Sequence, residues 1–147
     1  MRCDVKAVNL IAPSLVNQKA KDQNCDDAIF IRNDFITEAT FSNVFMVDQN
    51  ECLITHPADH LILCGITRNR IIAIAKEHGL KVVEKKFTLA NLLEAKEVFL
   101  TSTTFAIRPV SQINGKNLAS FNIKKSAQQN FKIASFLSNQ YQEFMQS

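Results

Sequence analysis

Short stretches rich in β-branched and aromatic residues dominate the first half of the chain, and polar residues separate them. The stretches are AIFIRNDFITEA (28–39), NVFMV (43–47) and CLITH (52–56). Such runs, bounded by polar turn residues, are typical of β-strands. Asn33 and Asp34 interrupt the first stretch and favour a two-residue hairpin turn. The pattern therefore predicts two consecutive hairpins between residues 28 and 56.

Two other segments have the hydrophobic spacing of helices. Residues 8–24 predict a helix with Pro13 in its first turn and apolar positions at Leu10, Ile11, Leu15 and Ala20. Residues 65–79 predict a helix between two glycines. Thr67 is the expected capping residue, and the apolar stripe consists of Ile71, Ile72 and Ala75.

The second half of the chain continues with both kinds of element. The expected elements are a strand at 81–88, a short helix at 89–96, one buried strand at 97–107, a turn at 111–116 and a terminal helix at about 119–144. No repeat, low-complexity segment or linker divides the sequence. We therefore expect residues 1–147 to form a single domain of mixed α/β class.

Composition narrows the functional classes. The chain has 147 residues, of which 46% are hydrophobic and 21% charged, as in an ordinary globular domain. The net charge of +3 is spread along the chain in pairs such as Lys85-Lys86, which gives no support to nucleic-acid binding. No apolar run is long enough for a membrane span, and no secretory signal opens the chain. A cytoplasmic location is the expectation.

Cysteine and histidine spacing does not predict a metal site. The four cysteines form no CxxC pair, which makes free thiols in a reducing compartment the expectation for Cys3, Cys25, Cys52 and Cys64. His56 and His60 stand four apart in HPADH with Asp59 between them. Pro57 favours a loop at this place, so a solvated turn is expected rather than a metal-binding face.

Three features are compatible with an anionic cofactor, although each also has an ordinary structural interpretation. Lys6 stands in the apolar segment RCDVKAVNL (2–10), where a half-buried amine would be costly unless it had a chemical role. Glu38 ends an apolar strand and needs a cationic partner if it is buried. The helix start at 65–67 and the hydroxyl cluster TSTT (101–104) are candidate phosphate sites. Together these features match the needs of pyridoxal phosphate.

Residues 38–68 resemble the signature of the class IV aminotransferases. The matching positions are Glu38, Thr40, Asn43, Val44, Phe45, Leu53, Thr55, Leu63, Gly65, Ile66 and Arg68. The segments RCDVKAVNL, THPADHLILCGITR, EVFLTSTTFAIRPV and INGK are most similar to D-amino acid aminotransferases within that family. The resemblance runs from Arg2 to about Leu118. It implies the large, cofactor-binding C-terminal domain of the fold-type IV pyridoxal-phosphate enzymes.

The resemblance also implies roles for individual residues. Lys6 would form the Schiff base with pyridoxal phosphate and act as the catalytic acid and base, and Glu38 would face the pyridine nitrogen. The implied cofactor-binding set is Lys6, Glu38, Leu63, Ile66, Thr67, Ser102 and Thr103. Leu63 would pack against the ring, and the last four residues would hold the phosphate. The implied reaction is transamination of D-amino acids, such as D-alanine, to 2-oxo acids.

Other interpretations stay open at this point. The same family includes branched-chain aminotransferases and aminodeoxychorismate lyase, and the chain can also be a non-catalytic fragment that retains only the cofactor seat. By the resemblance, the family's N-terminal small domain is absent here. We therefore expect a homodimer or association with that missing half, and no activity from the isolated chain. Phe41 replaces a small hydroxyl residue of the family and is expected to narrow the site.

Overall fold

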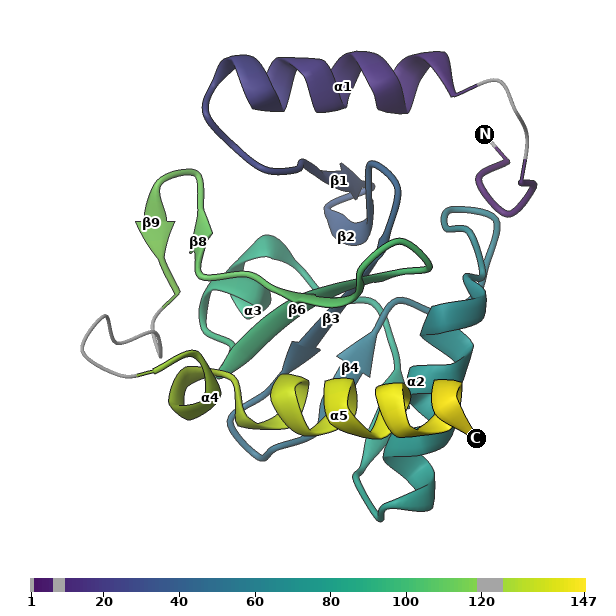
Figure 1. Ribbon diagram of the computed structural model, residues 1–147. Helices are drawn as coiled ribbons and strands as arrows, with labels where there is room; N and C mark the ends of the chain where they lie inside the picture. The colour runs from purple at the N-terminus through teal and green to yellow at the C-terminus, as the bar shows by residue number, and fades with distance from the viewer. Residues whose placement is uncertain (1, 7–9, 119–125) are drawn as a thin grey trace.

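The chain folds into a seven-stranded mixed sheet with helices on its faces (Figure 1). The computed structural model describes residues 2–6, 10–118 and 126–147. The strands are β1 (Ile29–Arg32), β2 (Phe35–Ala39), β3 (Asn43–Val47), β4 (Leu53–Thr55), β5 (Val82–Glu84), β6 (Glu97–Ser102), β7 (Ala106–Pro109), β8 (Gln112–Ile113) and β9 (Lys116–Asn117). The helices are α1 (Ile11–Asp22), α2 (Ile66–Glu77), α3 (Leu89–Leu93), α4 (Ala127–Asn130) and α5 (Lys132–Gln146).

Both predicted hairpins are confirmed. Asn33 and Asp34 have positive φ values of 50° and 67°, and Arg32 pairs with Phe35 across the turn from β1 to β2. Such left-handed backbone matches the twist of the flanking strands. Strands β3 and β4 form the second antiparallel pair. The turn chemistry in the sequence was thus sufficient to locate these strands.

β3 lies at the centre of the sheet. The strand order is β1-β2-β3-β4-β5, and β6 pairs with both β3 and β7. β4 and β5 are parallel and are connected through α2. β8 and β9 form a separate two-stranded ribbon, which confirms the turn predicted at 111–116. The sheet therefore brings the end of β2, the start of β3 and the end of β6 together, at the edge formed by the ends of these strands.

The prediction of one strand over residues 97–107 is wrong. β6 ends at Ser102, and the chain reverses into β7, where Ser102 pairs with Ala106. The Ser102 hydroxyl accepts a hydrogen bond from the Thr104 N–H at 3.2 Å. Short hydroxyl side chains bond to nearby backbone in this way and compete with strand pairing. The hydroxyl cluster is therefore a turn as well as a strand end.

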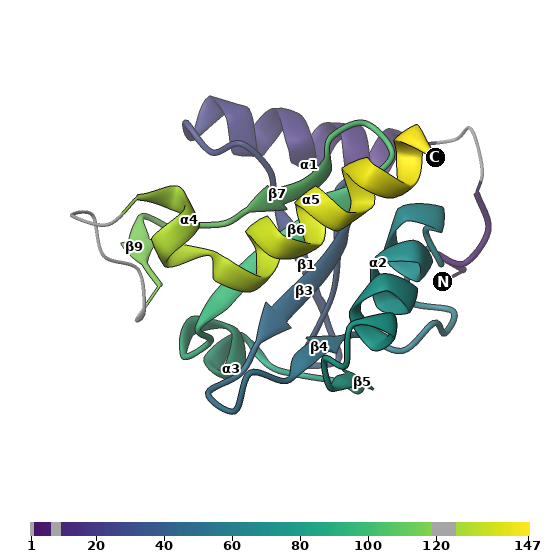
Figure 2. The ribbon, with the colours of Figure 1, turned by 60° about the horizontal axis from the view of Figure 1, so that its bottom comes forward.

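Alternating residues of β3 and β6 build two cores on opposite faces of the sheet, as expected for a period of two. Val44 and Met46 belong to the core that includes Leu92 of α3. Phe45 belongs to the core under α2 and α5, and its ring stacks on Phe99 with centroids 5.2 Å apart. Figure 2 shows α2 and α5 side by side over this face.

The helix at 65–79 is confirmed as α2, but its capping residue is not Thr67. Gly65 is the N-cap, with no side chain to cap the helix, and Thr67 lies within the first turn. Gly79 follows the helix with a φ of 76°, a conformation that favours glycine at a helix end. The N-terminus of α2 is therefore left without a side-chain cap.

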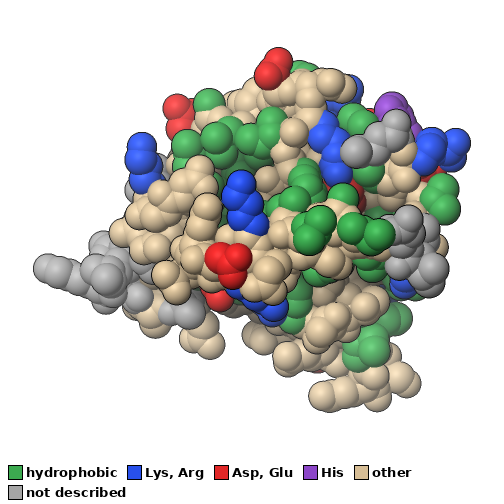
Figure 3. Space-filling view, turned by 90° about the horizontal axis from the view of Figure 1, so that it is seen from above, with side chains coloured by type: hydrophobic (Ala, Val, Ile, Leu, Met, Phe, Trp, Pro, Cys, Tyr) green, Lys and Arg blue, Asp and Glu red, His purple; other side chains and the backbone are tan. Residues whose placement is uncertain are grey.

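The first predicted helix is α1, whose apolar positions are mostly exposed. Leu10, Ile11 and Leu15 are 45%, 66% and 66% exposed, and Ala20 is the buried residue of this helix. α1 lies across one end of the molecule, and the view onto this end shows hydrophobic side chains at the surface (Figures 1 and 3). Asn17 connects α1 to the turn after β2 through the Thr40 hydroxyl, at 3.1 Å.

The other predicted elements are shorter than expected. β5 covers only Val82–Glu84, and α3 covers Leu89–Leu93 with Thr88 in a capping box. The predicted terminal helix becomes α4 and α5, and the part of that prediction at 119–125 lies outside the described residues. Phe131 lies between the two helices with a φ of −128°, and its side chain is buried in the core. In the described part of the chain, no helix has the length and apolarity needed to cross a membrane.

Glu97 ties the start of α5 to the sheet. Its two carboxylate oxygens accept hydrogen bonds from the N–H groups of Ile133 and Ala134, both at 2.9 Å. The negative charge also complements the positive end of the helix dipole. Burial raises the pKa of the Glu97 carboxyl above its ordinary value, although these N–H groups partly oppose the rise.

Glu97→Gln is expected to lower the free energy of unfolding by about 1–2 kcal/mol at pH 7, because the amide offers one acceptor oxygen in place of two. A carboxyl with a raised folded-state pKa adds stability as the pH falls through that pKa toward 4.5. The glutamine variant does not titrate, so the difference between the two proteins should widen on acidification. Urea titrations at pH 7 and pH 5 measure it, and a difference that narrows would contradict this account.

Candidate active site

Lys6 lies in the N-terminal segment, and the prediction that it is half-buried is wrong. Its side chain is exposed, and residues 2–6 form no strand. The segment is attached to the body through the Cys3 N–H, which donates to the His60 carbonyl at 2.8 Å. Val5, the apolar residue before Lys6, is itself 56% exposed, so it does not enclose the amine. Its role as the cofactor lysine stays a prediction.

Cys3 nevertheless brings this segment close to Glu38. Burial raises the pKa of the Cys3 thiol, and the nearby Glu38 carboxylate adds to this rise. Three residues of extended chain span at most about 11 Å. Lys6, three positions after Cys3, is therefore restricted to the neighbourhood of Glu38.

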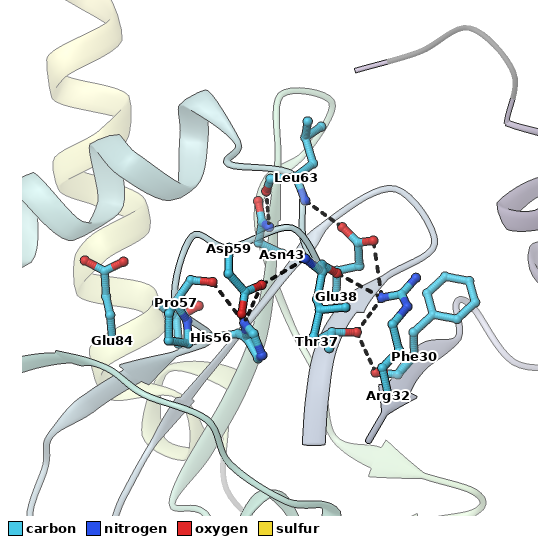
Figure 4. Close-up of polar contacts among 12 residues, drawn as sticks. Phe30, Arg32, Thr37, Glu38, Asn43, His56, Pro57, Asp59, Leu63 and Glu84 are labelled. Carbon is cyan, nitrogen blue, oxygen red and sulfur yellow. Dashed lines mark hydrogen bonds and ion pairs between the residues drawn. The ribbon is translucent and has the colours of Figure 1, made fainter. Parts of the chain in front are cut away.

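Glu38 lies one residue before the end of β2, and its carboxylate is held at both oxygens (Figure 4). The Leu63 N–H donates to Oε2 at 2.9 Å, and Nη1 of Arg32 lies 3.4 Å from Oε1. The side chain is 15% exposed. Burial raises the pKa of Glu38, and the Leu63 N–H and the Arg32 charge act in the opposite direction. The sequence argument required a cation beside this carboxylate, and the structure identifies it as Arg32.

Asn43 connects Glu38 to the loop that precedes α2. It pairs with Glu38 at the start of β3, and its Nδ2 donates to the Leu63 carbonyl at 2.7 Å. Gly65 passes so close that an added Cβ would lie 2.4 Å from Asn43 Oδ1. A glycine is therefore required at 65. These contacts fix the start of α2 next to Glu38, since only two residues separate Leu63 from Ile66.

The N-terminus of α2 has the properties of an anion site. The first N–H groups of a helix have no acceptor within the helix, and Gly65 provides no cap. Thr67 is 2% exposed, and its hydroxyl has no hydrogen-bond partner among the described residues. Ile66 turns its side chain outward and is 78% exposed. A buried hydroxyl without a partner is costly, and a bound phosphate oxygen would satisfy it.

The predicted hydroxyl cluster lies at the same edge of the sheet. Thr101 pairs with Asn43 across β3 and β6, which brings Ser102 and Thr103 to the turn beyond them. Ser102 is half-buried and Thr103 exposed. Thr101 is 1% exposed and its hydroxyl lacks a partner among the described residues, so this member of the predicted cluster is a candidate in addition to Ser102 and Thr103.

The HPADH segment is a turn, but the expectation that it is solvated is wrong for His56. Its ring is fully buried, and Nδ1 lies 2.9 Å from the Pro57 carbonyl oxygen. The Arg68 guanidinium donates to the His56 carbonyl at 2.8 Å and to Glu84 at 2.6 Å, which closes this region over the ring. No cluster of metal-ligating side chains occurs in the parts of the chain that the structure describes.

The described residues fit pyridoxal phosphate in two respects. Glu38 offers a buried, charge-balanced carboxylate for a ring nitrogen, and the uncapped start of α2, with the unpartnered Thr67 hydroxyl, offers a seat for a phosphate. Leu63, predicted to pack against the ring, lies between these two groups along the chain and donates to Glu38. Phe41 is 50% exposed in the turn after Glu38, where it borders the same edge.

Two residues of this arrangement had no role in the sequence argument. Asn43 was only a signature position, and Arg32 was not considered. Arg32 pairs with Phe35 at the start of β2, so hairpin register alone does not bring it to Glu38, and its long side chain makes that contact. The fold decides which loop lies beside which strand, and the sequence pattern alone does not give this.

Comparisons with known proteins identify the family that this chain matches. The family model "Amino-transferase class IV" matches residues 1–113. A D-alanine aminotransferase of Listeria monocytogenes serotype 4b (strain F2365) is 46% identical over 119 residues, which are 81% of this chain and 41% of that protein. A branched-chain aminotransferase from Thermoproteus uzoniensis, solved with norvaline, has a TM-score of 0.80 at 29% identity, covering 94% of this chain and 45% of its own.

A second solved structure, assigned as a 4-amino-4-deoxychorismate lyase from Legionella pneumophila, has a TM-score of 0.79 at 29% identity and covers 93% of this chain and 49% of its own. The chain thus spans less than half the length of each of these relatives. The shared part contains Glu38, the α2 N-terminus and β6.

Proposed function

Because the chain belongs to the class IV aminotransferases, we propose that it forms the cofactor-binding part of a pyridoxal-phosphate enzyme that transaminates D-amino acids. The observation that carries the proposal is the juxtaposition of the Glu38 carboxylate with the uncapped start of α2 through Leu63. One group suits a protonated ring nitrogen and the other a phosphate. Among known proteins, the 46% identity to a D-alanine aminotransferase favours D-amino acids as substrates.

When bound, pyridoxal phosphate supplies an aldehyde that reacts with amines and a ring that takes up the electrons left on the substrate. The protein's residues hold and orient it. Glu38 would accept a hydrogen bond from the ring nitrogen and keep the proton there, and Leu63 would pack against the ring. The N–H groups of Ile66 and Thr67 and the hydroxyls of Thr67, Ser102 and Thr103 would hold the phosphate.

Lys6 has two proposed tasks. Its Nζ would hold the cofactor covalently, and the freed amine would take the proton from the substrate Cα and deliver it to the cofactor carbon that carried the aldehyde. An exposed amine on a segment anchored through Cys3 has the freedom to move that these tasks require.

The substrate test uses the protein at its native length, meaning the complete product of the gene that encodes these 147 residues. It is supplied with pyridoxal phosphate, D-alanine and 2-oxoglutarate. We expect pyruvate and glutamate to form, with L-leucine and L-valine inert as amino donors. The 147-residue chain alone is expected to be inactive, because positioning a substrate carboxylate needs groups held in fixed geometry and the matched residues make up only 41% of the D-alanine aminotransferase relative. Turnover of the branched-chain L-amino acids instead would overturn the substrate class. Release of pyruvate from 4-amino-4-deoxychorismate would favour the lyase, as one solved neighbour suggests.

A further inference from the structure

A single nitrogen of Arg32 connects Glu38 to two other parts of the structure. Nη1 lies 3.4 Å from Glu38 Oε1, 2.5 Å from the Thr37 hydroxyl oxygen and 3.1 Å from the Leu61 carbonyl oxygen. The guanidinium carbon also lies over the Phe30 ring, 4.7 Å from its centroid (Figure 4). Arg32 is therefore held in one orientation by β1, β2 and the loop before α2.

This arrangement fixes the orientation of the Glu38 carboxylate but does not use all of its capacity to accept hydrogen bonds. Arg32 occupies Oε1 and the Leu63 N–H occupies Oε2. An ionised carboxylate has about four lone-pair positions, so each oxygen keeps capacity for another donor. The two contacts prevent rotation of the carboxylate about its last bond and leave it able to accept a further hydrogen bond.

The charge of Arg32 affects the ionisation of Glu38, because the Glu38 side chain is largely removed from solvent. Burial raises the pKa of Glu38. Three groups that face the carboxylate oppose this rise, namely the Leu63 N–H, the Arg32 guanidinium and the Cys3 thiol. Arg32 is the charged group among the three. Without it, Glu38 would bind a proton more readily and would lose the charge that a protonated ring nitrogen needs.

We propose that Arg32 is a positioning residue that keeps Glu38 ionised and oriented toward the ring nitrogen of the bound cofactor. The inference rests on the proposed function, since it gives Arg32 a task that acts through Glu38. It also predicts that Arg32 affects the ionisation of Glu38 in the protein without cofactor, where this ionisation can be measured by itself.

The first test is a titration of Glu38 in the cofactor-free protein at its native length. Glutamate labelled with ¹³C at the side-chain carboxyl is incorporated, and the Glu38 resonance is assigned by its loss in Glu38→Gln. Arg32→Gln should shift the Glu38 midpoint to higher pH. The matched control is Arg108→Gln, because Arg108 also lies on a strand over a phenylalanine ring, at 4.0 Å from Phe105, and should leave the midpoint in place.

Arg32→Lys separates charge from packing. A lysine keeps the positive charge but loses the planar guanidinium, so the Glu38 midpoint should stay near that of the wild type. If Arg32→Lys moves the midpoint as far as Arg32→Gln, or if Arg32→Gln does not move it, the inference is overturned. Circular dichroism of each variant verifies that the protein is folded, and Arg32→Met serves as the uncharged variant in the same comparison if Arg32→Gln does not fold.

The second test uses the protein loaded with pyridoxal phosphate and records the visible absorbance of the cofactor against pH. Arg32→Gln should shift this profile in the same direction as the Glu38 midpoint, and Arg108→Gln should not. A shift of the midpoint without any effect of Arg32→Gln or Glu38→Gln on the cofactor absorbance would contradict the proposed function. An unmoved midpoint in the first test would contradict the role of Arg32 alone.

Discussion

Lys6→Ala is expected to abolish covalent attachment of the cofactor and to slow transamination by roughly 10³-fold or more, since one amine serves as both nucleophile and proton carrier. The measurement is reduction with borohydride in the presence of pyridoxal phosphate, followed by peptide mapping. In the wild-type protein the pyridoxyl label should lie on Lys6, and in the variant no lysine should carry it in stoichiometric amount.

The matched control for this prediction is Lys19→Ala. Lys19 is an exposed lysine of α1, so its removal changes the charge equally without touching the proposed site. It should leave labelling and turnover unchanged. A label on another lysine in the wild-type protein, or a Lys6→Ala variant that still incorporates the cofactor covalently, would remove Lys6 from the mechanism.

Glu38→Gln is expected to retain the cofactor while slowing proton transfer by ~10²-fold, the scale observed when one electrostatic partner of a transition state is removed. The amide cannot keep a proton on the ring nitrogen, so the electrons left on the substrate are less well stabilised. Burial raises the pKa of Glu38 above its ordinary value of 4.5. The rate should therefore decline as the pH falls through that raised pKa, and this decline should be absent in the glutamine variant.

Glu97→Gln provides the control for Glu38→Gln, because both replace a buried carboxylate that accepts backbone hydrogen bonds and has a raised pKa. Glu97 lies on β6 and contacts the start of α5, so its replacement should reduce stability without changing the chemistry. Stopped-flow measurement of the single half-reaction with D-alanine compares the two variants directly. Equal rates in Glu38→Gln and the wild type would show that the ring nitrogen has another partner.

Local chemistry was sufficient to predict most elements of the fold. Asn33 and Asp34 favour the left-handed backbone that a tight hairpin needs, and Gly79 does the same at the end of α2. The alternation of residues in β3 separates the two cores, because strand side chains point alternately to opposite faces. These outcomes depend on residues a few positions apart, and so the sequence by itself determined them.

The signature spacing likewise identified the main parts of the site. Glu38, Asn43 and Gly65 are positions where the family constrains residue type, and in the structure they meet through the contacts of Asn43 and Leu63. The sequence could indicate which residues are constrained. It could not indicate that Gly65 is required because the Asn43 side chain occupies the space of a Cβ.

Only the tertiary structure decided which groups compensate the buried charges and which side chains are exposed. Arg32 and Glu38 lie in one hairpin, and the loop before α2 adds the Leu61 carbonyl and the Leu63 N–H that hold them. Glu97 meets the N–H groups of α5 from 36 and 37 positions away. His56 was expected to be solvated and is buried, whereas Lys6 was expected to be half-buried and is exposed. Burial depends on what packs against a segment from remote parts of the chain, and local hydrophobicity does not contain that information.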